Sequence, residues 1–358
     1  FSQIGNEEVT NGDFSQIGSE LVTNGDFATD SNWSKSGQVT ISGGVAYFDS
    51  DGTFTGVAQT LSGISGKNAK VVVEITEYNQ GTLKVLFSGG TQQNLPTSVG
   101  VHTLYFSNVS SNTINIARLG GVTNIKIDNV SVKEVGQDWE NSFGSAWVFD
   151  GTKTTLGTGL DGSYLKQSNV TTSGKIYKAV ITTSGGLDAN NNVKLYGQNN
   201  YNQNITSDGT HTKYFTADNT YFRFFGTATD RPISIDSVSI KEVGQHWTIG
   251  GDDITIDDSK ASFVNADTNS DYIQQNNVAV VGRTYKVSFD VSNLGVGESV
   301  KLRYPFQNTS ANANGSYSFV AEALETYLRI TPNSTNGTFD IDNIVVQELK
   351  HDATNLML

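Results

Sequence analysis

Few residues of this chain could carry out acid–base or nucleophilic chemistry, and they are scattered. The sequence contains no Gly-x-Ser-x-Gly nucleophile motif and no Gly-rich phosphate-binding loop. Paired carboxylates such as Asp252–Asp253 and Asp257–Asp258 lie in turn-like segments, where a solvated turn is a simpler interpretation than a catalytic pair. We therefore predict that the protein is not an enzyme. The four histidines are spread along the chain, at His102, His211, His246 and His351.

The composition excludes further classes of protein. The chain has 358 residues and a formal net charge of −13, so it lacks the basic surface of a nucleic-acid-binding protein. The sequence has no run of 18 apolar residues, so it predicts no membrane-spanning helix. Cysteine is absent, which excludes disulfides and thiolate metal sites. We expect a folded extracellular or virion-surface protein with neither nucleic acid nor membrane insertion among its partners.

An internal repeat organises the chain. The stretch Ile127–Trp139 recurs as Ile235–Trp247, and a weaker third copy covers Ile341–Leu349. The aspartates of the three copies are 108 and 106 residues apart, which is the length of one small β domain. The predicted divisions are an N-terminal extension (1–18), three domains (19–136, 137–244 and 245–350) and a C-terminal tail (351–358).

Short alternating apolar segments between glycine-rich turns predict strands. Gly174–Ile181 and Gly282–Phe289 are examples in equivalent positions of two repeats. Turn signals recur about every 8–12 residues, and no window carries a sustained helical period. The predicted fold class is all-β, with three tandem jelly-roll β-sandwich domains.

The motifs of the first repeat resemble a known family. Leu21–Phe27, Trp33, Val39–Phe48 and Ile127–Val132 follow one another as in the jelly roll of carbohydrate-binding-module family 4/9. The later repeats lack the Asn-Gly-x-Phe start. Tandem domains joined by Val-Lys-Glu-Val-Gly-Gln-x-Trp are similar to those of structural proteins of tailed bacteriophages, such as fibres and head decorations.

This resemblance implies a non-enzymatic structural protein of a fibre, filament or virion appendage, from a phage or a bacterial surface. Its domains would display weak glycan-binding modules, and repetition would give avidity for cell-surface glycans. The alternative is a carbohydrate-binding segment of a secreted glycan-degrading enzyme. No cofactor is required under either hypothesis.

The resemblance also implies a structural calcium between the first and last strands of a domain. The matching positions are Asn24, Asp26 and Asp128, whose oxygen atoms suit a hard cation. The alternative is that these side chains cap turns through local hydrogen bonds.

Sugar binding would use flat aromatic rings, because the apolar face of a pyranose stacks on a π surface. Packing in the core or between domains is the alternative for each ring. The candidate carbohydrate-binding residues are Trp33, Tyr47, Tyr196, Tyr201 and Tyr272.

A short duplication opens the sequence. Phe1–Asp13 repeats almost unchanged as Phe14–Asp26, and only one copy can supply the first strand of the first domain. The spare copy either pairs with the sheet edge of a neighbouring chain, which would build a fibre or filament by self-association, or packs along its own domain as a linker. Its candidate assembly residues are Phe1, Ile4, Val9 and Phe14.

Overall fold

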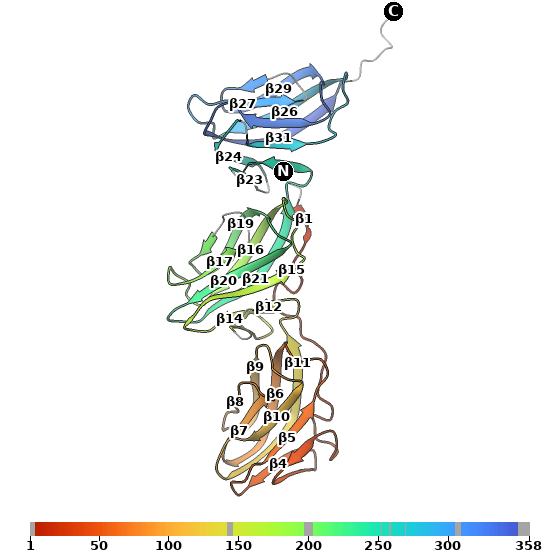
Figure 1. Cartoon of the computed structure of the whole chain (residues 1–358), viewed down its shortest axis with the longest axis vertical. Coiled ribbons are helices and arrows are strands. Elements are labelled where there is room, and N and C mark those ends of the chain that lie inside the picture. The colour runs from red at the N-terminus through yellow and green to blue at the C-terminus, as the bar shows by residue number, and fades with distance from the viewer. Residues whose placement is uncertain are drawn as a thin grey trace, which may run out of the picture.

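The computed structural model describes residues 4–141, 146–196, 203–251, 253–257, 259–268, 270–304 and 309–349. Every regular element in these residues is a β-strand, so the all-β prediction is confirmed. The strands form six sheets with antiparallel pairing, which pack in pairs as three sandwiches stacked along the long axis (Figure 1). The described residues include no helix that could cross a membrane.

The first sandwich contains two five-stranded sheets, ordered β3-β4-β11-β6-β9 and β2-β5-β10-β7-β8. The chain passes repeatedly from one sheet to the other, which is the jelly-roll connection. Its strands are β2 (Ser34–Ser36), β3 (Val39–Ser42), β4 (Val45–Ser50), β5 (Gly56–Thr60), β6 (Asn68–Gln80), β7 (Leu83–Phe87), β8 (Gln93–Asn94), β9 (Gly100–Phe106), β10 (Thr113–Arg118) and β11 (Thr123–Val135).

The second sandwich repeats this order with β12 to β21, and the short β1 (Ile4–Glu7) joins it beside β21. Adding ten to a strand number of the first sandwich gives its counterpart. The strands are β12 (Glu140–Asn141), β13 (Trp147–Phe149), β14 (Thr154–Leu156), β15 (Leu160–Ser168), β16 (Ile176–Ser184), β17 (Asn191–Tyr196), β18 (Gln203–Ile205), β19 (Gly209–Thr216), β20 (Tyr221–Ala228) and β21 (Ile233–Val243).

The third sandwich repeats the order again, with the sheets β23-β24-β31-β26-β29 and β22-β25-β30-β27-β28. Its strands are β22 (Trp247–Gly250), β23 (Ile254–Ile256), β24 (Ala261–Ala266), β25 (Tyr272–Gln275), β26 (Thr284–Ser292), β27 (Val300–Tyr304), β28 (Thr309–Ala311), β29 (Gly315–Glu322), β30 (Leu328–Pro332) and β31 (Gly337–Glu348).

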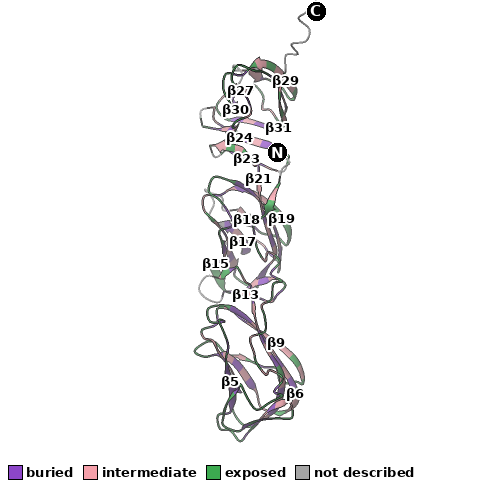
Figure 2. Cartoon of the chain, turned by 90° about the vertical axis from the view of Figure 1, so that its right-hand side faces the viewer, coloured by how far each residue is buried: buried purple, intermediate pink, exposed green. Residues whose placement is uncertain are grey.

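Each sandwich has a core of its own, built by the alternation of apolar and polar residues. In β20, every second residue is buried, which places one face of the strand inside. Figure 2 shows buried residues in the strands of all three sandwiches. The three cores are separate clusters of aliphatic and aromatic side chains. Large side chains with almost no exposure fill them, including Phe48, Phe87, Trp147, Phe222, Phe263 and Phe289.

The same type of junction, here called the joint, connects the first sandwich to the second and the second to the third. Gly136, directly after β11, has φ +65, and a Cβ there would lie 2.4 Å from the Phe149 ring. Gly244, directly after β21, has φ +63, and its Cβ would lie 2.9 Å from the Ile256 side chain. Only glycine fits either position, because the next sandwich packs directly against the backbone.

Candidate functional site

The first residues of the chain belong to the second sandwich. Strand β1 pairs antiparallel with β21, where Ile4 lies opposite Val243. Phe14 is completely buried in the second core, and its ring centroid lies 5.3 Å from that of Trp139. Residues 4–14, here called the first segment, therefore lie along a strand more than 220 residues away in the sequence (Figure 1).

The second copy of the duplication makes equivalent contacts with the first sandwich. Ile17 forms a bridge with Val135, the last residue of β11. Phe27 is buried, with its ring centroid 5.4 Å from that of Trp33. Residues 17–27 are here called the second segment. They give the first sandwich an edge pairing and a buried phenylalanine, as the first segment does for the second sandwich.

A buried glutamine holds the backbone of each segment. The Gln167 Oε1 accepts a hydrogen bond from the Thr10 N–H, and its Nε2 donates to the Thr10 carbonyl, both at 2.9 Å. Gln59 makes the same two bonds to Thr23, both at 2.8 Å. Because both the oxygen and the nitrogen of the side-chain amide bind the threonine backbone, each glutamine recognises an extended backbone rather than a particular side chain.

A glutamate anchors the other end of each segment to the closing strand. The Glu7 carboxylate accepts hydrogen bonds from the Ile240 N–H at 2.7 Å and the Ser239 hydroxyl at 2.5 Å. Glu20 binds the Val132 N–H at 2.8 Å and the neighbouring serine hydroxyl in the same way. Charge-assisted bonds of this kind are about twice as strong as neutral ones.

The Asn-Gly pair of each segment permits a close backbone approach. The Val238 N–H donates to the Gly12 carbonyl at 2.8 Å, and the Val130 N–H donates to the Gly25 carbonyl at 2.8 Å. A Cβ on Gly12 would lie 2.1 Å from the Val238 carbonyl oxygen, and one on Gly25 2.0 Å from that of Val130. Any side chain there would displace the segment.

The two segments also share an unusual turn. Phe14 and Phe27 have φ angles of 57° and 46°, in the left-handed region that bulky residues avoid. This backbone strain costs about 1–3 kcal/mol per residue. Burial of each phenylalanine in its core offsets that cost, so the turn depends on docking of the segment.

The described residues of the spare copy contact their own chain, and pairing with a neighbouring chain stays a prediction. Val9 and Phe14 are buried in the core of the same chain, and Ile4 pairs with β21 of the same chain. Phe1 lies outside the described residues. The first segment is more than a surface linker, because it provides the Asn-Gly-x-Phe start that the second repeat lacks.

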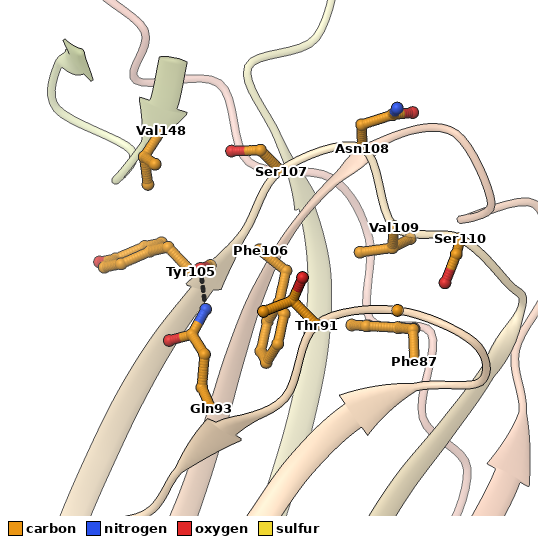
Figure 3. A pocket seen from close by; sticks show the side chains of 11 residues that line it. Phe87, Thr91, Gln93, Tyr105, Phe106, Ser107, Asn108, Val109, Ser110 and Val148 are labelled. Atoms are coloured by element: carbon orange, nitrogen blue, oxygen red, sulfur yellow. Dashed lines mark hydrogen bonds between the residues drawn. The ribbon is translucent and has the colours of Figure 1, made fainter. Parts of the chain in front are cut away.

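A cavity of about 460 Å³ lies where the first two sandwiches meet (Figure 3). Tyr105 and Gln93 line one side, and Val148 of the second sandwich lies across from them. Burial, together with the charge of Asp150, raises the pKa of Tyr105. An aromatic ring beside amide and hydroxyl groups could contact a small polar ligand such as a sugar.

The sequence analysis did not select this cavity, although a repeated signal marks it. The Gln93 Nε2 donates to the Tyr105 carbonyl at 2.6 Å, and Gln203 makes the same bond to Tyr214 in the second sandwich at 3.0 Å. The glutamine therefore has a structural role in both sandwiches. Val148 of the second sandwich completes the lining, so no motif of a single repeat could have predicted the whole cavity.

The predicted sugar-binding residues do not form one surface. Trp33 lies in the first core with 6% of its surface exposed, and its Nε1 donates to the Asn24 carbonyl. The proposal that Trp33 stacks on sugars is therefore wrong, because the ring packs against Phe27 and has no open face. The Tyr196 side chain and Tyr201 lie outside the described part of the chain.

Tyr47 and Tyr272 are on different sandwiches, and each has a cation beside its ring. The Lys126 Nζ lies 5.2 Å from the Tyr47 ring centroid, and the Tyr47 hydroxyl accepts a hydrogen bond from Asn124. The Arg329 guanidinium lies 4.0 Å from the centroid of Tyr272. A cation at this distance occupies one face of each ring, and sugar stacking on Tyr47 and Tyr272 stays a prediction.

The three predicted calcium ligands take part in local turns. The Asn24 side chain donates to the Thr29 and Ser31 carbonyls, both at 2.8 Å. Burial raises the pKa of Asp128, and the charges of Glu74 and Asp26 raise it further. Within the described ranges, no group of three His, Cys, Asp or Glu side chains could hold a metal. Calcium binding stays a prediction, which titration calorimetry with calcium would test.

Two of the histidines cap equivalent turns. The Nε2 of His102 lies 2.7 Å from the Ser98 carbonyl oxygen, and that of His211 lies 2.8 Å from the Ser207 carbonyl oxygen. Both histidines therefore have a structural role in their turns.

Neither a protein-family model nor a curated protein matches the chain. Among solved structures, the chain is similar to the N-terminal CBM22-1–CBM22-2 tandem domain of Xyn10C from Paenibacillus barcinonensis. That match has 12% identity and a TM-score of 0.23, and it covers 60% of this chain and 94% of that one.

Two archaeal virus structures are similar over more of the chain. One is from Sulfolobus turreted icosahedral virus, with 11% identity over 89% of this chain and 90% of that one, and a TM-score of 0.25. The other is described as a triple jelly roll, with 11% identity, coverage of 88% and 89%, and a TM-score of 0.24. Similarities at this level assign neither a family nor a ligand, and the jelly-roll fold rests on the strand order itself.

Proposed function

We propose that this chain is a non-enzymatic structural protein, a rod of stacked jelly rolls within a fibre, filament or virion appendage on a phage or bacterial surface. The observation that supports this most directly is the course of the two segments. They are consecutive in sequence, yet one completes the second sandwich and the other the first. The stretch between them therefore ties the two sandwiches together a second time, in addition to the joint at Gly136.

Side-chain contacts reinforce the connection between the first two sandwiches. Ile17 of the second segment reaches Gly151, whose Cβ position is 3.4 Å from the Ile17 Cδ1. The Ser107 hydroxyl donates to the Trp147 carbonyl across the junction at 2.9 Å. A flexible tether between binding modules would need none of these contacts, whereas a rod that carries load would use all of them.

The joint itself supports an extended stack. Because the backbone at Gly136 and at Gly244 packs against the next sandwich, the same glycine geometry leads into each new sandwich. Repeating one joint produces a regular rise and rotation per domain, which is what a fibre requires. The many open sheet edges give such a rod further surfaces for self-association.

Small-angle scattering and electron microscopy of the full chain test this proposal. We expect a straight particle with fixed angles between its sandwiches, and end-to-end assemblies as the concentration rises. A matched variant, Gly136→Ala, should bend at the first joint, because its Cβ would clash with Phe149. Freely jointed monomers at every concentration would contradict the structural role.

One observation favours the alternative, a carbohydrate-binding segment of a secreted glycan-degrading enzyme. The cavity beside Tyr105 combines an aromatic ring with amide and hydroxyl groups (Figure 3). A glycan array with the full chain, repeated with Tyr105→Ala, tests it. Glycan binding that is lost in this variant would support the alternative. A rod could also display such a binding site, so microscopy decides whether the chain assembles.

A further inference from the structure

The third sandwich carries the same docking residues as the other two. Gln275 lies opposite Trp247 in the pairing of β25 with β22, at the positions that Gln167 and Trp139 occupy in the second sandwich. The Gln275 side chain is only half-buried, and its amide has no hydrogen-bond partner among the described residues.

The closing strand of the third sandwich has an open edge. Strand β24 pairs with β31 only as far as Ile341, and β26 pairs along the other edge of β31. No strand in the described part of the chain pairs with residues 343–348 on the first edge. On the second sandwich, this edge is the one that β1 occupies.

The apolar residues along this edge are less buried than their counterparts. Val238 and Ile240 of the second sandwich are 5% and 0% exposed. The equivalent Ile344 and Val346 are half-buried, and Val345 between them is 54% exposed. The third sandwich thus presents an apolar strip beside an unpaired sheet edge and a glutamine amide.

We infer that this strip, with Gln275 and Trp247, is the docking site for a third copy of the segment, of sequence Glu-Leu-Val-Thr-Asn-Gly-Asp-Phe. The inference goes beyond the proposed function, since it assigns a peptide-binding site and its ligand whatever role the rod has. Both filled sites bind this sequence, with Glu8 in place of Leu21 in the first segment, through the same backbone and carboxylate contacts, which define the chemistry of the occupant.

The order of the filled sites favours a segment of the same chain. The copy ending at Phe27 docks on the first sandwich, and the copy ending at Phe14 docks on the second. Phe1 precedes Phe14 by 13 residues, the period of the duplication. A further copy that ended at Phe1 would therefore match the third sandwich. A second molecule is a poorer source, because its own segments would have to leave equivalent sites.

The expected contacts follow from the filled sites, with one difference. The glutamate would accept a hydrogen bond from the Val346 N–H, and Gln275 would hold the threonine backbone. Val345 replaces the serine that binds the second carboxylate oxygen in the other sandwiches. The third site should therefore bind its segment less tightly than the second, because one charge-assisted hydrogen bond is missing.

The test is a full chain extended ahead of Phe1 by Ser-Glu-Leu-Val-Thr-Asn-Gly-Asp, the sequence of residues 19–26. Hydrogen exchange, resolved by residue, is measured for the chain with and without this extension. We expect at least tenfold slower exchange at Ile344 and Val346, and unchanged exchange in the first two sandwiches. Gln275→Ala should reduce this protection without changing the exchange of the other two closing strands.

The matched control is the same extension with alanine in place of glycine, because a Cβ at this position would meet a carbonyl oxygen as it does at Gly12. Equal exchange at Ile344 and Val346 in the two extended chains, or no protection in either, would overturn the inference. The free peptide Ser-Glu-Leu-Val-Thr-Asn-Gly-Asp-Phe, added to the unextended chain, distinguishes the source of the segment. Protection by this peptide but not by the extension would overturn the same-chain source. None of these outcomes bears on whether the chain forms rods, which microscopy decides separately.

Discussion

The second and third sandwiches have the same strand order, but only the second has a described segment along its closing strand. Strand β21 is therefore covered where β31 is open, and the buried Ile240 contrasts with the half-buried Val346. The comparison shows that the ten strands of a repeat define the jelly roll without the segment. The segment adds a lid over the core and closes one sheet edge.

The comparison also shows where specificity resides. The residues of the docking site, such as Gln167, belong to the sandwich, whereas the chain that they bind comes from the far end of the sequence. Binding an extended chain along a sheet edge uses backbone hydrogen bonds for affinity and pockets for selected side chains. The buried Phe14 is the side chain selected here.

Removing the buried ring should have the largest effect. Phe14→Ala is expected to lower the free energy of unfolding of the second sandwich by about 3–5 kcal/mol, the usual cost of a large cavity. Urea unfolding followed by hydrogen exchange would measure this for each sandwich. Phe27→Ala should cost the first sandwich a similar amount and leave the second unchanged. If both variants weakened the same sandwich, the assignment of segments to sandwiches would be wrong.

Blocking the close backbone approach should cost somewhat less. Gly12→Ala places a Cβ 2.1 Å from the Val238 carbonyl oxygen, and we expect a loss of about 3 kcal/mol, since overpacking costs about 1–3 kcal/mol and sometimes more. Thermal unfolding of the second sandwich is the measurement. Gly120→Ala is the control, because nothing lies within 4 Å of its Cβ position. Equal melting of the two variants would mean that the segment is not docked.

Two equivalent glutamines sharpen the comparison between sandwiches. Gln167→Ala should destabilise the second sandwich by about 2 kcal/mol, because it removes both hydrogen bonds between the buried glutamine and the Thr10 backbone. Gln275→Ala in the unextended chain should change the stability of the third sandwich by less than about 0.5 kcal/mol. Chemical denaturation of both variants measures the difference. A loss of similar size in both would show that the glutamine stabilises the sandwich itself.

Much of the fold could be predicted from the sequence, because it is encoded locally and then repeated. The closing motif at Ile127 and Ile235 marks equivalent strands, and the alternation of apolar residues places one face of each strand inside. The sequence also showed that the Asn-Gly-x-Phe start is duplicated at the N-terminus and missing from the second repeat.

The partner of that spare start could not be predicted. Docking of the first segment depends on a glutamine, a tryptophan and a strand edge that are more than 120 residues away from it. No local pattern states which sheet edge an extended segment will join. An edge of a neighbouring chain would provide the same backbone hydrogen bonds. Trp33 was misassigned for a related reason, since a ring that looks available in the sequence is covered by Phe27 of the second segment.

The smallest expected effect is a difference in acid sensitivity between the sandwiches. The third sandwich contains an ion pair between Lys260 and Asp340 at 2.6 Å, and the Asp340 side chain is 8% exposed. Burial acts to raise the pKa of Asp340, but hydrogen bonds from Lys260, Ser262 and Asn293 outweigh it and hold the pKa below its usual value.

A carboxyl group with a lowered pKa in the folded state stabilises the protein fully above its unfolded value of 3.8. That contribution is lost as the pH falls below this value, because the unfolded chain then binds the proton first. The third sandwich should therefore lose this contribution as the pH falls below about 3.8, and Asp340→Asn should flatten that dependence. The equivalent position in the second sandwich is Ser234, which does not titrate. Thermal unfolding across this range, resolved by sandwich, checks the difference, and a pH dependence that survives Asp340→Asn would assign it to other carboxylates.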